Sequence, residues 1–342
     1  MERKNNLQSS APQKASTTTE SNAFTNPPQK AKRYFSYDLY VDTTLNLSLE
    51  DEVFQLDVFK LKNKFVVLAP RTDGKLFWDY SLIGHLIKKV SYPLTSETGK
   101  RVLLSLIKLV EQVLASGNCL ARFDPSNVFL THSGQVLLKH VRIVEPVYEA
   151  RRHNIEDTLR VAKKLFEGCR VPPDIAHLLS LMEAQVKTNL YSIHGSLVPH
   201  FNRGWGFIQC YEQIKFKITV AEKNQILLKL PYINTWRSVI QCNLVLQETY
   251  DFVLGSYDPR PGSKSEIDQQ LESAELFLEF LRNGHSHRMQ RKLINVACQF
   301  DLIVLVLFPL LLPRLQEAIL EVLKDRGLRL LQEIFRPLML SD

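Results

Sequence analysis

The sequence has few cysteines, and they form no pattern. The five cysteines among its 342 residues stand far apart, with no CxxC pair and no histidine at metal-ligand spacing. This distribution argues against a disulfide framework and against a structural zinc site. We therefore expect free thiols in a reducing compartment.

Long hydrophobic runs are also missing. The longest uninterrupted apolar run, 302–312, contains Pro309 and is too short for a bilayer crossing, which needs about 20 residues. The N-terminus begins MERKNN and has no apolar segment typical of a secretory signal. We expect a buried helix or helix pair at 302–312, no membrane association, and a cytoplasmic or nuclear location.

Acidic residues are fewer than basic ones. Lysine and arginine total 43 against 36 acidic residues, which gives a formal net charge of +7. A basic surface favours a polyanionic partner such as RNA, through phosphate contacts and counterion release. Charge alone is weak evidence, because many basic proteins merely have a basic surface.

Apolar residues are scarce before Tyr34, so residues 1–32 predict a disordered polar tail. Short alternating runs such as 53–59 and 65–68 predict a few strands. Apolar residues at three-to-four-residue spacing then predict helices, at 101–115, 157–166, 174–185 and 205–220. With 45% hydrophobic residues the chain can build two cores, and the predicted fold class is mainly α with a small β portion (α+β).

A further helix is predicted near the C-terminus. The capping-box pattern SKSE at 263–266 predicts its start. Gly284 suits the left-handed conformation that ends helices, so the polar stretch 282–288 is predicted to turn a corner before the next helix.

A predicted long helix, a polar loop and a predicted hairpin follow one another up to residue 142. The loop and hairpin read LARFDPSNVFL at 120–130 and GQVLLKHVR at 134–142. This segment resembles a protein-kinase catalytic loop and the hairpin that follows it. The resemblance implies a kinase-like domain, which we assign to residues 33–203.

The catalytic groups of a kinase are absent from this segment. The resemblance places Arg122 at the proton-accepting aspartate, Asp124 at the loop lysine and His140 at the metal-binding aspartate. Asn127 is the one conventional metal ligand left, and a single neutral amide would hold magnesium very weakly. We expect a pseudokinase that is not an active protein kinase and has little residual ATP or magnesium binding. Asn127 is then kept for the fold or for nucleotide binding without transfer.

Four motifs beyond this loop follow one another in a recognisable order. They read YSIHGSLVPHF at 191–201, TWR at 235–237, LFLEFLRNGHSH at 276–287 and LFPLLL at 307–312. Together they resemble the kinase/endoribonuclease family of the unfolded-protein-response sensor and RNase L, which carries a KEN ribonuclease domain. The resemblance implies an all-helical KEN-type ribonuclease domain, which we assign to residues 204–335, and a kinase-like module that holds two copies together.

Cleaving RNA without a metal requires a base for the 2'-hydroxyl, an acid for the leaving 5'-oxygen and a cation for the phosphorane charge. The resemblance makes His287 the general acid, Arg282 the stabiliser of phosphate charge and Asn283 an orienting hydrogen-bond residue. The tyrosine that the family has upstream is missing here, so a base is missing unless Tyr257 or His285 substitutes.

Each of these residues also has a purely structural interpretation. A lone histidine in a polar loop is ordinarily a solvated residue. Arg282 and Asn283 could be the terminal charge and cap of a helix. Trp236 is more often a core residue than an RNA-stacking one.

The expected function is therefore that of an RNA endonuclease that needs no cofactor, leaves a cyclic phosphate and acts in mRNA processing or decay. Its partners would be RNA and a second subunit, in a homodimer or in a heterodimer with a related kinase/ribonuclease. The alternative is a non-catalytic protein that binds RNA or pairs with an active relative and modulates it. One sequence feature bears on the choice between the endonuclease and the non-catalytic protein: the Arg-Asn-x3-His spacing is kept, whereas the base is missing.

Overall fold

The computed structural model describes residues 53–56, 66–69, 92–131, 133–241, 243–254, 265–287 and 297–339. All of them belong to one compact unit, Ser36–Asp342. The described part is mostly helical with a small strand portion, as the sequence predicted. The predicted polar tail at 1–32 lies outside the described residues, as do parts of the predicted strands.

The described strands are short and antiparallel. They form a three-stranded sheet in the order β1-β5-β6 and two separate pairs, β2-β3 and β4-β7. Their bounds are β1 Val53–Gln55, β2 Val66–Ala69, β3 Tyr92–Thr95, β4 Cys119–Leu120, β5 Val128–Thr131, β6 Val136–Leu138 and β7 Ile143–Val144. Val128 faces Leu138 across the predicted hairpin, which is confirmed.

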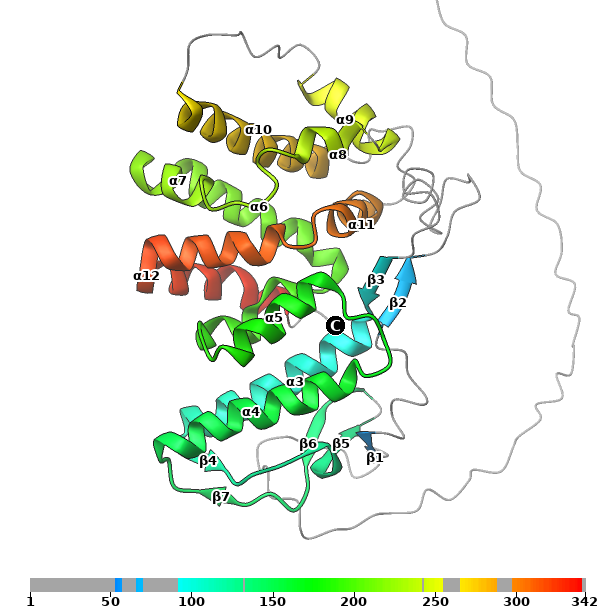
Figure 1. Ribbon diagram of the computed structural model, residues 1–342, viewed down its shortest axis with the longest axis vertical. Helices are drawn as coiled ribbons and strands as arrows, with labels where there is room; N and C mark the ends of the chain where they lie inside the picture. The colour runs from blue at the N-terminus through cyan, green and yellow to red at the C-terminus, as the bar shows by residue number, and fades with distance from the viewer. Residues whose placement is uncertain are drawn as a thin grey trace, which may run out of the picture. The chain divides into compact units, whose positions relative to one another are not determined.

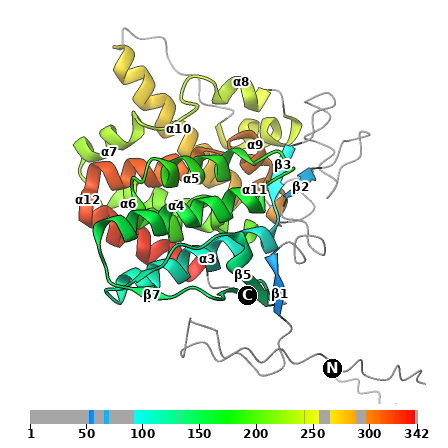
Figure 2. The same ribbon diagram turned by 60° about the horizontal axis from the view of Figure 1, so that its bottom comes forward.

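The described helices are α3 Glu97–Ala115, α4 Tyr148–Leu165, α5 Pro173–Glu183, α6 His200–Phe216, α7 Val220–Leu227, α8 Trp236–Gln241, α9 Leu244–Leu254, α10 Glu266–Ser286, α11 Ala297–Leu307 and α12 Leu311–Leu338. Short 3-10 turns occupy Pro125–Asn127 (η1), Thr188–Ile193 (η2) and Gly195–Leu197 (η3). Figures 1 and 2 both show β5 and β7 at one end and α8 and α10 toward the other.

Helix α3 confirms the helix predicted at 101–115 and begins four residues earlier. Ser96 caps it, because its hydroxyl accepts a hydrogen bond from the amide of Gly99. Its apolar stripe, including Leu103, Leu106 and Val110, is buried. This stripe packs against α4 and β6.

Helix α4 corrects the prediction of a helix starting at residue 157, because it begins at Tyr148. The extra turns bury the polar residue Asn154, so they lack the apolar periodicity that a sequence search detects. The Asn154 side chain accepts from the amide of Leu120 and donates to its carbonyl, at 2.9 Å and 2.7 Å. The buried face of α4 therefore holds the polar loop by hydrogen bonds.

Helix α10 corrects two further predictions. Ser265 caps it by accepting from the amide of Asp268, so the cap lies two residues after the predicted one, Ser263. Gly284 does not end the helix, which continues to Ser286. The predicted turn at 282–288 is therefore wrong for residues 282–286, which are helical. A Cβ at Gly284 would overlap the ring of Phe300, so this glycine is needed for close packing.

The apolar run at 302–312 forms the predicted helix pair, α11 and the start of α12. Lys324 has φ 53° and ψ −128° and breaks α12 internally. No single described helix is long and apolar enough to cross a membrane, although α11 and α12 meet that criterion together as a bent pair.

The predicted boundary between residues 203 and 204 falls inside α6. Helix α12 packs against α6 and α7, and also against η2 and η3, which precede that boundary. Figure 1 shows α12 between α5 and α6. The division into two domains stays a prediction.

Candidate functional site

The C-terminal end of α10 brings together the three residues of the predicted catalytic motif. The Arg282 guanidinium donates to Oδ1 of Asn283 at 2.9 Å. Asn283 and His287 share one face of the helix, since the His287 amide donates to the Asn283 carbonyl at 2.9 Å. All three side chains are partly exposed.

The neighbour on this face is Phe252 of α9, whose ring centroid lies 6.3 Å from that of His287. The end of α10 thus presents a guanidinium, an amide and an imidazole beside an aromatic ring. Tyr257, the predicted base, lies outside the described residues. Among the residues that are described, no group of His, Cys, Asp and Glu could hold a metal ion.

The second base candidate, His285, lies in the core. It is 2% exposed, and its Nδ1 lies 2.6 Å from Oδ1 of Asp301, which is also buried. The edge of Trp205 packs on its ring, and the Gly204 backbone lies so close that a Cβ there would overlap the imidazole. In this conformation His285 cannot reach the 2'-hydroxyl of an RNA.

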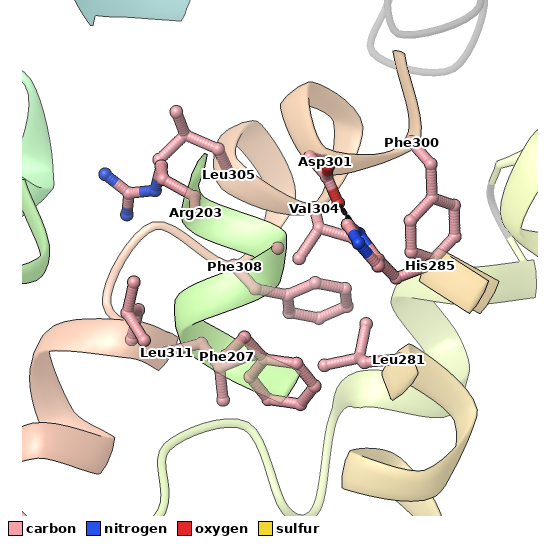
Figure 3. A pocket seen from close by; sticks show the side chains of 12 residues that line it. Arg203, Phe207, Leu281, His285, Phe300, Asp301, Val304, Leu305, Phe308 and Leu311 are labelled. Atoms are coloured by element: carbon pink, nitrogen blue, oxygen red, sulfur yellow. Dashed lines mark hydrogen bonds and ion pairs between the residues drawn. The ribbon is translucent and has the colours of Figure 1, made fainter. Parts of the chain in front are cut away.

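The His285–Asp301 pair borders a small, partly open pocket of about 40 Å³ between α6, α10, α11 and α12. Figure 3 shows Phe207, Leu281 and Phe308 around this space, with the pair at its edge. Since most of the lining is apolar, we interpret the pocket as a packing defect of the core. The pair fixes α10 to α11.

The loop at 120–130, which resembles a kinase catalytic loop, is fixed to α4 by one buried carboxylate. Asp157 of α4 is 0% exposed and accepts from the amide of Phe123 at 3.0 Å. Its other oxygen lies 2.8 Å from Arg122 and 2.7 Å from Arg160. Arg122, which the sequence resemblance aligned with the proton acceptor of kinases, is therefore an ion-pair partner.

Asn127 uses both ends of its amide within the chain. Its Oδ1 accepts from the Asp124 amide at 2.9 Å, and its Nδ2 donates to the Lys139 carbonyl at 3.1 Å. The Asp124 carboxylate in turn accepts a hydrogen bond from the Ser126 amide. Asp124 and Asn127 together form a capping box at the start of η1. This arrangement favours the interpretation that Asn127 is kept for the fold.

A buried chain of side chains that sequence reasoning missed lies between α5, η3 and α12. Ser196 Oγ lies 2.7 Å from His194 Nδ1, and His194 Nε2 lies 3.0 Å from His177 Nδ1. His177 Nε2 then lies 3.1 Å from a carboxylate oxygen of Glu317. We call these four residues the histidine chain.

The protons of the histidine chain can be assigned from its geometry. The Ser196 amide donates to His194 Nδ1, so that nitrogen is an acceptor and the proton of a neutral His194 is on Nε2. His177 Nδ1 must accept that proton, which leaves the His177 proton on Nε2, directed at Glu317. This arrangement satisfies the chain with a neutral His194 and an ionised Glu317.

The pKa shifts agree with this assignment. Burial, reinforced by His177 and Arg203, holds the pKa of His194 well below its usual range. Burial raises the pKa of Glu317, but the hydrogen bonds from His177 and Lys187 outweigh that effect and lower the pKa. Lys187 lies 2.8 Å from the second Glu317 oxygen. The only sequence signal for this network was isolated histidines among apolar neighbours.

Comparisons with family models, with curated proteins and with solved structures found no match to this chain. The kinase/endoribonuclease interpretation therefore depends on the sequence motifs alone.

Proposed function

We propose that this chain is a metal-independent RNA endonuclease of the kinase/endoribonuclease kind, in which a pseudokinase module supports dimerisation and a KEN-type helical domain cleaves RNA. The observation that carries the proposal is the partly exposed group of Arg282, Asn283 and His287 at one helix end. Such a protein would act in the cytoplasm or nucleus.

The chemistry of this group suits phosphodiester cleavage. The RNA 2'-oxygen would attack phosphorus while the bond to the 5'-oxygen breaks, leaving a 2',3'-cyclic phosphate. His287 would give its proton to the leaving 5'-oxygen, and Arg282 would offset the charge of the phosphorane. Asn283 holds the guanidinium of Arg282 in place. The proton of the 2'-hydroxyl would go to the phenolate form of Tyr257, which has first lost its own proton to solvent.

One observation favours a second candidate, a non-catalytic RNA-binding or dimerisation partner. His285 is buried against Asp301 and unable to serve as the base. The non-catalytic protein would use Arg282 and His287 for phosphate contacts alone and would modulate an active relative.

The deciding experiment is cleavage of a fluorescent stem-loop RNA in EDTA, at protein concentrations high enough to permit dimerisation. If His287 is the general acid, His287→Ala should slow cleavage by about 100-fold or more. His153→Ala is the matched control, because His153 is a partly exposed histidine on the distant helix α4.

The concentration dependence tests the second subunit. If the site is completed by dimerisation, the rate should rise faster than linearly with protein concentration. A folded, dimeric protein that cleaves nothing, yet binds the stem-loop through Arg282, would establish the non-catalytic candidate instead.

A further inference from the structure

An open groove of about 360 Å³ lies between α6 and the second half of α12. Its volume is within the range of small-ligand sites. Trp205 is 51% exposed at its wall, and one edge of the indole packs on His285, which holds the ring in place. The remaining lining residues are Gln209, Gln213, Leu330, Glu333, Ile334 and Leu338.

The polar groups of this groove have no protein partners in the described part of the chain. Gln209 and Gln213 follow Trp205 at four-residue spacing on α6, so the three side chains share one face. Glu333 faces them from α12. None of the three polar side chains forms a hydrogen bond or ion pair with another described residue. The groove therefore offers an aromatic wall together with two amides and a carboxylate that are open to a ligand.

Two cations lie on the same helix as Glu333. Arg329 precedes it by four residues and Arg336 follows it by three, spacings that place all three near one face of the helix. Both arginines are exposed. Arg336 lines a second pocket on the other side, where it interacts with the Glu111 carboxylate. Arg329, which forms no ion pair within the described residues, is thus the cation available to a ligand in the groove.

We infer that this groove binds one unpaired guanine base of a single-stranded RNA, with a flanking phosphate on Arg329. The inference depends on the proposed function, because it names how the substrate RNA is recognised. Single-stranded RNA is typically read by stacking a splayed base on an aromatic ring and bonding its Watson–Crick edge.

Guanine fits these groups better than the other bases do. Its Watson–Crick edge presents two adjacent donors, N1–H and N2–H, beside the O6 acceptor. The Glu333 carboxylate is acceptor-only and can take both donors. An amide of Gln209 or Gln213 can donate to O6. Adenine, cytosine and uracil each offer a single donor position on this edge, so they would leave part of the carboxylate unsatisfied.

The test is fluorescence anisotropy of labelled octamers, UUUUGUUU and UUUUUUUU, with 2'-O-methyl groups that prevent cleavage through the 2'-oxygen. The wild-type chain should bind the guanine octamer at least about fivefold more tightly. Trp205→Leu should weaken that binding by about fivefold or more, because the stacking surface is lost. Glu333→Gln should remove the preference for guanine, because one amide oxygen cannot take both donors.

Matched controls are Phe216→Leu and Asp325→Asn. Phe216 is a 72% exposed aromatic residue on α6, Asp325 is an exposed acid on α12, and neither lines the groove. Both variants should bind as the wild type does. Circular dichroism of each variant checks that the fold is kept.

Equal binding of both octamers by the wild type, or unchanged binding by Trp205→Leu, would overturn the inference. If His287-dependent cleavage persists in that case, only the groove inference fails. If the wild type binds no RNA and cleaves none, the proposed function fails as well.

Discussion

Gly284 lies in the middle of the last turns of α10, where a glycine normally weakens a helix. Alanine there would gain about 1 kcal/mol of helix propensity in an exposed position. Here the added methyl group would overlap the Phe300 ring of α11. We therefore expect Gly284→Ala to lower the free energy of unfolding by about 1–3 kcal/mol, as overpacked cores do.

Urea unfolding followed by circular dichroism measures this effect. Ser286→Ala, two residues later and exposed, is the control and should stay within about 0.5 kcal/mol of the wild type. A Gly284→Ala protein as stable as the control would mean that α10 and α11 are not in close contact at this point.

Single residues show where the sequence was informative. Trp236 was predicted to be a core residue, and it is 0% exposed, with its indole donating to Ser273 at 3.0 Å. The role of Gly284 was predicted wrongly because its reason, Phe300, is sixteen residues away in the sequence. A local pattern cannot reveal a glycine that is required by a distant neighbour.

At the scale of elements, the histidine chain joins α5 and η3 to α12. His194 is neutral in the folded protein because burial lowers its pKa, whereas in the unfolded chain its pKa is about 6.5. Below pH 6.5 the unfolded state binds a proton that the folded state does not. Stability must therefore fall as the pH drops, by up to about 1.4 kcal/mol per pH unit for this one group.

Glu317 causes a second loss of folding stability at lower pH. Its folded pKa is depressed, so its contribution is present above the unfolded value of about 4.5 and is lost as the pH falls below it. We expect unfolding free energies to decline from pH 6.5 downward and to decline more steeply below pH 4.5.

The variant His194→Gln isolates the contribution of His194 to the pH dependence of the unfolding free energy. Its amide can still donate to His177 but no longer titrates, so the protein should be less stable at pH 7 and show a shallower slope between pH 6.5 and 5. His153→Gln, at a partly exposed position on α4, is the control and should keep the wild-type slope. An unchanged slope in His194→Gln would contradict the proton assignment.

Elements with apolar stripes, such as α3, were predictable from the sequence, as were the hairpin β5-β6 and the pair α11 and α12. Elements whose buried face is polar were not. The first turns of α4 were missed because Asn154 is buried there, and the histidine chain was missed because its members are distant in sequence. Of the candidate site, the sequence placed Arg282, Asn283 and His287 together but could not show that His285 is buried.

At the scale of the whole molecule, the buried apolar residues from Leu56 to Met339 form one continuous core. We therefore expect the described residues to unfold as one cooperative unit, although the sequence predicts two domains, 33–203 and 204–335. Native-state hydrogen exchange measures this, because α3 and α10 should then show the same opening free energy. Distinct values for the two helices would support independently folding domains.

The contacts of α12 also determine when the first half of the chain can complete its folding during synthesis. Gln316 and Glu317 bind Ile193, Gly195 and His177, partners 121 to 140 residues earlier in the chain. Until those residues leave the ribosome, the carbonyl and amide groups around η3 lack their side-chain partners and part of the core stays uncovered. The nascent chain would depend on chaperones over this interval, since exposed apolar surface in long-range folds invites aggregation.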